Sequence, residues 1–123
     1  MNIAATVARI VLGVLFTFMG VMAFTMSSPP PLPGLAGTFN QAFYASHWLW
    51  FIAAAQFIIG VLFLINRYVP IALIMLAAFL YNSFAFHITM LPSAIFAPIV
   101  VFVLWLVVAL KYRSAFAPLV RVP

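Results

Sequence analysis

Cysteine, aspartate and glutamate are absent from this chain of 123 residues, and each absence excludes a class of chemistry. Without cysteine the protein has no disulfide, no reactive thiol and no thiolate ligand for a metal. Without carboxylate side chains it has no paired-acid catalytic site, no acid for a Ser-His-Asp triad, no cage for a hard cation and no carboxylate proton relay. We therefore predict no catalytic residues and no metal site, and any redox activity would need a cofactor or a partner.

Charged residues of either sign are also scarce. They make up 4% of the chain, whereas hydrophobic residues make up 69% and the mean hydropathy is +1.33. Soluble proteins carry about 25% charged residues, so this composition cannot supply the polar surface of a soluble fold. It predicts an integral membrane protein whose main partner is the lipid bilayer. The five basic residues adjoin apolar runs, which is typical of membrane topology rather than of nucleic-acid binding.

The apolar residues fall into four runs, and one membrane crossing needs about 20 such residues. Four crossings with short connections account for the length. We therefore predict a single all-α domain, an integral membrane four-helix bundle. Its expected parts are spans at 3–26, 47–66, 70–90 and 95–110, a proline-rich outer loop at 27–46 and a cytoplasmic tail at 111–123.

The loop after the first span contains "SSPPPLPGLAG", where four prolines and two glycines in eleven residues disfavour a regular helix. Beyond it, Thr38 and Gln41 have the spacing of a capping box at a helix N-terminus. Leu35, Phe39 and Phe43 follow at intervals of four and would share one face of such a helix. We therefore expect a short helix lying in the interface at the outer face of the membrane.

The basic residues predict the orientation of the bundle. With an even number of spans, the N-terminus, the second connection and the C-terminal tail share one side, and every cation falls there. Connections rich in Lys and Arg stay in the cytoplasm, so we predict that both termini are cytoplasmic. The cations are Arg9, Arg67, Lys111, Arg113 and Arg121.

Five polar side chains interrupt the second and third spans: His47, Gln56, Asn82, Ser83 and His87. At a rise of about 1.5 Å per residue, Gln56 and Asn82 lie near mid-membrane and both histidines lie near the outer face. Ser83 and His87 are four residues apart and share a stripe, with Asn82 on its flank. If the spans face one another, we predict a polar cleft in the outer half of the bundle, with the amides at its floor and the imidazoles at its mouth.

Three interpretations of these side chains stay open. Amides in membrane helices commonly hold helices together, at about 0.6–2 kcal/mol, and a histidine near the headgroups needs no function. The five residues would alternatively bind a small amphipathic molecule such as a quinone or a lipid headgroup. His47 and His87, at matched depth, would suit axial ligation of a haem iron, although no sequence signature favours haem. Met19, Met22 and Met26 share a face of the first span, and we interpret them as packing rather than copper ligands.

Four segments follow one another along nearly the whole chain: "ARIVLGVLFTFMG", "QFIIGVLFLINRYVPIAL", "NSFAFHITMLP" and "YRSAFAPL". In this order they resemble the DoxX/DoxD-like family of small four-helix membrane proteins, most clearly in the Arg-aromatic-x-Pro turn and the Asn-x-x-x-Phe-His end of the third span. The resemblance implies a bundle in the bacterial inner membrane. It also implies a loose association with redox systems, such as thiosulfate:quinone oxidoreductase and oxidant-defence assemblies.

Asn82 and His87 match positions of that family pattern. Gln56, four residues before Gly60, stands where many relatives carry an acidic residue, so a proton-coupled role inferred from relatives is in doubt here. Two functions follow as expectations. The first is a non-catalytic accessory subunit of a membrane redox or energy-converting, quinone-linked complex. The second is a stand-alone binding protein or transporter that holds a small hydrophobic molecule, a lipid or a quinone, in the outer cleft.

Overall fold

A computed structural model describes residues 3–26 and 28–122, and all regular structure in these residues is helical. The predicted loop and tail each include one residue outside this range, Ser27 and Pro123. The four long helices begin and end within one residue of the predicted spans. In chain order the elements are α1 (Ile3–Thr25), α2 (Gly34–Ala45), α3 (Trp48–Ile65), α4 (Val69–Met90), η1 (Pro92–Ala94), α5 (Phe96–Lys111), α6 (Arg113–Phe116) and η2 (Ala117–Val120).

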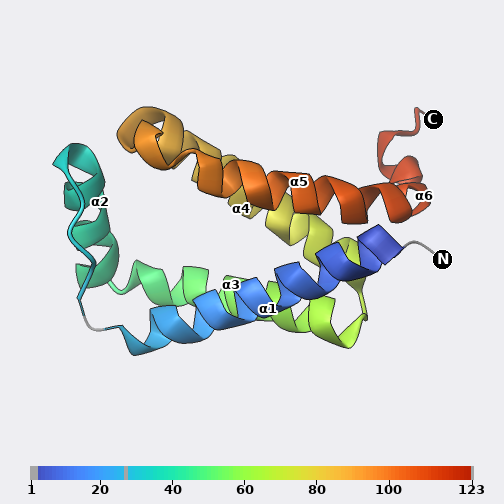
Figure 1. The fold of residues 1–123 in the computed structure, drawn as a ribbon, viewed down its shortest axis with the longest axis horizontal. Coiled ribbons are helices and arrows are strands. Elements are labelled where there is room, and N and C mark those ends of the chain that lie inside the picture. The colour runs from blue at the N-terminus through green and yellow to red at the C-terminus, as the bar shows by residue number, and fades with distance from the viewer. Residues whose placement is uncertain (1–2, 27, 123) are drawn as a thin grey trace.

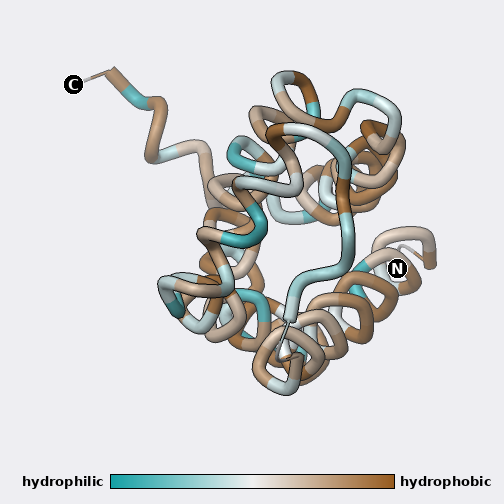
Figure 2. Tube along the Cα trace, turned by 90° about the vertical axis from the view of Figure 1, so that its left-hand side faces the viewer, coloured by the Kyte–Doolittle hydropathy of each residue, from teal (hydrophilic) through white to brown (hydrophobic). Residues whose placement is uncertain are grey.

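The helices are suited to a membrane. Within the described residues α1, α3 and α4 are each long and apolar enough to cross a bilayer. Helix α5 has 16 residues and, after a bend of 83°, is followed by α6 and η2, so the bent pair would be a fourth crossing. Most of the tube in Figure 2 is brown, the colour of hydrophobic residues. The protein is thus an all-α chain with three or four helices that can cross a membrane.

Helix α3 ends and α4 begins within a tight turn at 66–68. Asn66 and Tyr68 both adopt a left-handed backbone, with φ of 56°, a conformation that asparagine tolerates better than most residues. The backbone N–H groups of Asn66 and Arg67 donate to carbonyls in the last turn of α3 and so cap the end of that helix. Pro70 lies in the first turn of α4, as predicted. The two helices are therefore antiparallel neighbours.

Helices α1 and α3 approach each other at glycines. A Cβ added at Gly20 would lie 2.8 Å from the backbone nitrogen of Phe57, closer than real Cβ atoms come. A Cβ added at Gly60 would collide with the backbone of Thr17. Small residues allow such contact between membrane helices, where packing replaces the hydrophobic effect as the attractive force.

The four long helices form two pairs, α1 beside α3 and α4 beside α5 (Figure 1). The pairs converge at the end of the molecule that carries both chain termini, and the core lies mainly in this half. At the opposite end the pairs splay apart, and α2 lies across the opening (Figure 1). Fully buried members of the core include Leu12, Phe16, Phe63, Leu76 and Val108.

The convergent end also carries the basic residues, which lie in the first half of α1, the α3–α4 turn, the end of α5 and the segment that follows it. There the Arg9 guanidinium donates a hydrogen bond to the carbonyl of Phe63, in the last turn of α3. This cation adds a second donor to a carbonyl that already accepts from the backbone N–H of Asn66, and it complements the helix dipole. The Tyr112 hydroxyl donates to Oδ1 of Asn66 at 3.5 Å and joins α5 to the same turn.

The short helix α2 exists as expected, but the predicted capping box at its start is wrong. It begins at Gly34, which has φ of 60°, and Pro33 is its N-cap residue. Thr38 therefore lies inside the helix, where its hydroxyl donates to the carbonyl of Gly34 at 3.5 Å, and it forms no capping box. Leu35 is 70% exposed, whereas Phe39 and Phe43 are half-buried and pack toward the other helices.

Candidate ligand-binding site

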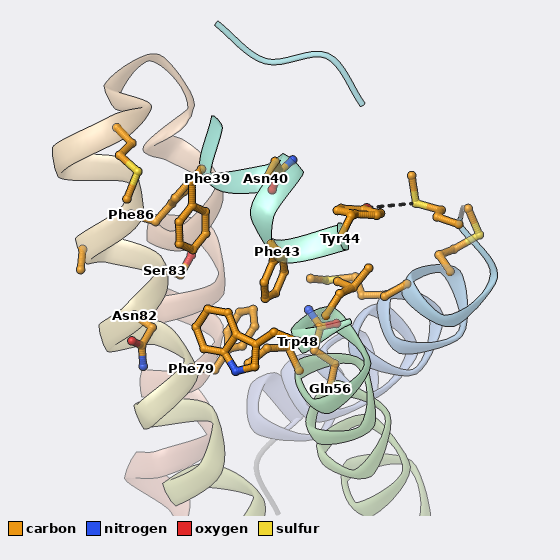
Figure 3. Close-up of a pocket in the computed structure, with 18 of the residues that line it drawn as sticks. Phe39, Asn40, Phe43, Tyr44, Trp48, Gln56, Phe79, Asn82, Ser83 and Phe86 are labelled. Carbon is orange, nitrogen blue, oxygen red and sulfur yellow. Dashed lines mark hydrogen bonds between the residues drawn. The ribbon is translucent and has the colours of Figure 1, made fainter. Parts of the chain in front are cut away.

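The splayed half of the molecule contains a cavity of about 740 Å³ between α1, α2, α3 and α4 (Figure 3). Pockets that hold small molecules measure about 300–1,000 Å³, so this one is large enough for a ligand. Its lining is mostly aromatic and apolar. Polar side chains come from α2, α3 and α4, and no charged side chain lines it.

Helix α2 closes this cavity with two phenylalanines. Phe39 and Phe43 stack on each other with ring centroids 5.8 Å apart. Phe43 meets the Trp48 ring of α3 edge to face at 5.1 Å, and Phe39 lies 5.4 Å from the Phe86 ring of α4. Such aromatic pairs contribute about 0.5–1.5 kcal/mol each. They hold α2 across the gap between α3 and α4.

Gln56 is the most deeply buried polar side chain of the site. It lies near the middle of α3, is 7% exposed and lines the cavity. No hydrogen bond joins its carboxamide to another of the described residues. The polar atoms of this amide are not sealed off from the cavity, so they are available to a ligand there. Figure 3 shows Gln56 on the α3 wall, below Tyr44.

Further polar side chains line the cavity: Asn40 and Tyr44 on α2, Trp48 on α3, and Asn82, Ser83 and Thr89 on α4. The side chains of Asn40 and Ser83 make no hydrogen bond within the described part of the chain. Asn82 is exposed, and its Nδ2 donates to the carbonyl of Ala78 at 2.9 Å, which leaves its Oδ1 available. Hydrogen-bonding groups therefore stand on three helices around one space.

Neither predicted histidine lines the cavity. His47 is exposed at the N-cap of α3, with φ of 65°, and its ring lies 4.6 Å from that of Trp50. His87 is half-buried, and its Nδ1 donates a hydrogen bond to the carbonyl of Ser83 at 2.7 Å. Each histidine thus contacts a residue close to it in the sequence instead of facing the cavity. Of the five predicted site residues, the structure brings Gln56, Asn82 and Ser83 together.

Sequence reasoning did not assign Asn40 or the phenylalanines of α2 to the site. A weak signal exists, because Phe39, Asn40 and Phe43 share one face of a helix while Thr38 and Gln41 lie on another. Residues Met19, Met22 and Met26, which were expected to pack, line the cavity from α1. The remaining lining includes Phe79 and Phe86 of α4.

Comparisons with known protein families, with curated proteins and with solved structures find no match to this chain. The likeness to DoxX/DoxD-like proteins therefore stays a prediction based on the quoted segments.

Proposed function

We propose that this protein binds a small, uncharged, lipid-soluble molecule in the cavity between α1, α2, α3 and α4. The observation that carries the proposal is the unpaired carboxamide of Gln56, on a side chain that is 7% exposed and lines a cavity of about 740 Å³. In a purely structural bundle, an amide at this depth would be expected to bond across a helix interface. A bound molecule with one or two oxygen atoms would satisfy it.

The proposal includes a membrane orientation. All five cations lie at the convergent end, which by the positive-inside tendency is cytoplasmic, so the cavity opens in the outer half of the bilayer. Helix α5, with 16 residues, extends about 24 Å and serves as a fourth span, because Lys111 at its end can reach the headgroups through its long side chain. Both termini are then cytoplasmic. A bacterial inner membrane is the location implied by the family resemblance.

Binding or carriage is favoured over catalysis. The chain has no thiol and no carboxylate side chain, and the cavity has no charged lining residue. The alternative is the accessory subunit of a quinone-linked redox complex, which rests on the resemblance. The two functions differ in what accompanies the purified protein.

A test combines purification into lipid nanodiscs with native mass spectrometry and solvent extraction. We expect the unchanged chain to retain about one small molecule. Ala85→Trp should abolish retention, because Ala85 lines the cavity and an indole there would fill it. The matched control is Ala97→Trp, at an exposed position of α5 outside the lining, which should retain the molecule. Equal retention in both variants would refute the proposal, and an empty cavity with a stable protein partner would favour the accessory subunit.

A further inference from the structure

We propose, building on the function proposed above, that the bound molecule has a flat, uncharged ring bearing carbonyl or hydroxyl oxygens, of the quinone or phenol type. The Gln56 carboxamide binds an oxygen of this ring, and the aromatic side chains of α2, α3 and α4 enclose it. Four properties of the cavity lead to this ligand class.

The first property is the absence of charge. Every polar residue of the lining is an amide, a hydroxyl or an indole, and the chain has no acidic residue that could enter as a counter-ion. A charged group desolvated without a partner is strongly unfavourable in an apolar site. A phosphate or ammonium headgroup is therefore excluded from this space, and with it an ordinary phospholipid headgroup.

The second property is the shape of the walls. Rings from four helices line the cavity, among them Phe18 on α1, Phe39 and Phe43 on α2, Trp48 on α3, and Phe79 and Phe86 on α4. Figure 3 shows these rings around the space between α3 and α4. Aromatic walls offer faces and edges that favour a flat ring in stacked or T-shaped contact. A flexible chain gains less from such walls, and a sugar needs more hydrogen bonds than they provide.

The third property is the set of hydrogen-bonding groups in the cavity lining. The Gln56 carboxamide has both an N–H donor and a carbonyl acceptor. It can therefore donate to a ring carbonyl or accept from a ring hydroxyl, which are the two forms of a quinone-type oxygen. Asn40 and Ser83, on other helices, supply unpaired groups for a second ring oxygen.

The fourth property is the apolar margin of the cavity on α1 and at the end of α4. Four of the six methionines of the chain line it, namely Met19, Met22, Met26 and Met90. Methionine side chains are flexible and adapt to irregular apolar partners. They suit an alkyl tail that leaves the ring and continues into the lipid.

Trp48 provides a direct reporter, because it lies in the cavity lining and the other two tryptophans do not. We would prepare a chain with Trp50→Phe and Trp105→Phe in nanodiscs and titrate it with decyl-benzoquinone. We expect saturable quenching of Trp48 by the quinone. Decanol, decyl sulfate and decyltrimethylammonium, which carry the same tail, should displace it at least tenfold less well.

Two controls identify the site. In a matched chain that keeps Trp50 and carries Trp48→Phe and Trp105→Phe, quenching should rise linearly, since Trp50 is as exposed as Trp48 but lies outside the cavity lining and reports only partition into the bilayer. Gln56→Leu should weaken quinone binding about tenfold, the factor expected for one buried hydrogen bond. Because Trp105 donates a hydrogen bond to the Leu73 carbonyl, the same displacement series is repeated by native mass spectrometry on the unsubstituted chain.

The outcomes separate the two proposals. Decanol or a charged amphiphile that binds as tightly as the quinone, or a Gln56→Leu chain that binds the quinone unchanged, overturns the ligand class and leaves a binding protein of another specificity. No saturable binding by any of the four compounds, together with no retained molecule in the purified protein, overturns the binding function itself.

Discussion

Replacing Gln56 with leucine should change stability and binding in opposite directions. The side chain is 7% exposed and its amide has no partner among the described residues, so the empty protein bears the cost of burying it. That cost is about 1–3 kcal/mol for a group taken from water, but polar contacts between membrane helices average only about 0.6 kcal/mol. We therefore expect Gln56→Leu to raise the free energy of unfolding of the empty protein by about 1 kcal/mol.

The measurement is equilibrium unfolding in mixed micelles, by raising the mole fraction of a denaturing detergent and following helix content. Thr17→Val is the comparison variant, because the Thr17 hydroxyl is buried without a partner in the described part of the chain and lies outside the cavity. Both variants should be stabilised, whereas only Gln56→Leu should lose affinity for the ligand. Destabilisation by Gln56→Leu would mean that the amide has partners within the fold, and the reasoning about the site would fail.

Three further predictions test the packing of α1 against α3, the covering of the cavity by α2, here called the lid, and the orientation in the membrane. Gly60→Ala should destabilise the protein by about 1–3 kcal/mol in the same unfolding assay, because the added methyl group collides with the backbone of α1; a neutral effect would contradict the close α1–α3 contact. Ser83→Cys in this cysteine-free chain should react slowly with a membrane-permeant maleimide and several-fold faster when Phe43→Ala opens the lid, while equal rates would show that α2 does not cover the cavity. Ser46→Cys should be labelled by an impermeant maleimide added to intact cells, and Ser114→Cys only after permeabilisation; the reverse pattern would overturn the proposed sidedness.

The long helices could be predicted to within one residue, because their ends follow from local signals. Asn66 allows a left-handed backbone at the end of α3, and Pro70 suits the first turn of α4. The start of α2 was misplaced, since the Thr38–Gln41 spacing predicted a cap that the chain does not use. The N-cap is instead Pro33, five residues earlier, and Gly34, with its positive φ, begins the helix.

The site was predictable only in part. Depth along a span follows from counting residues, which predicted Gln56 and Asn82 near mid-membrane and both histidines near the outer face. Helix rotation does not follow from counting, and the two histidines illustrate this. His87 is bonded to the carbonyl of its own helix at Ser83, and His47 lies against Trp50 at a helix cap, so depth alone did not bring either to the cavity.

By itself the sequence indicated that this protein lies in a lipid bilayer. It also determined the order and length of the helices and the gathering of the basic residues at one end. These properties depend on composition and on neighbours along the chain. Tertiary structure alone decided that two helix pairs splay, that α2 covers the gap through Phe39 and Phe43, and that an unpaired Gln56 faces the space beneath. The physical reason is that helix rotation and separation are set by contacts between distant segments, such as the glycine-mediated approach of α1 to α3.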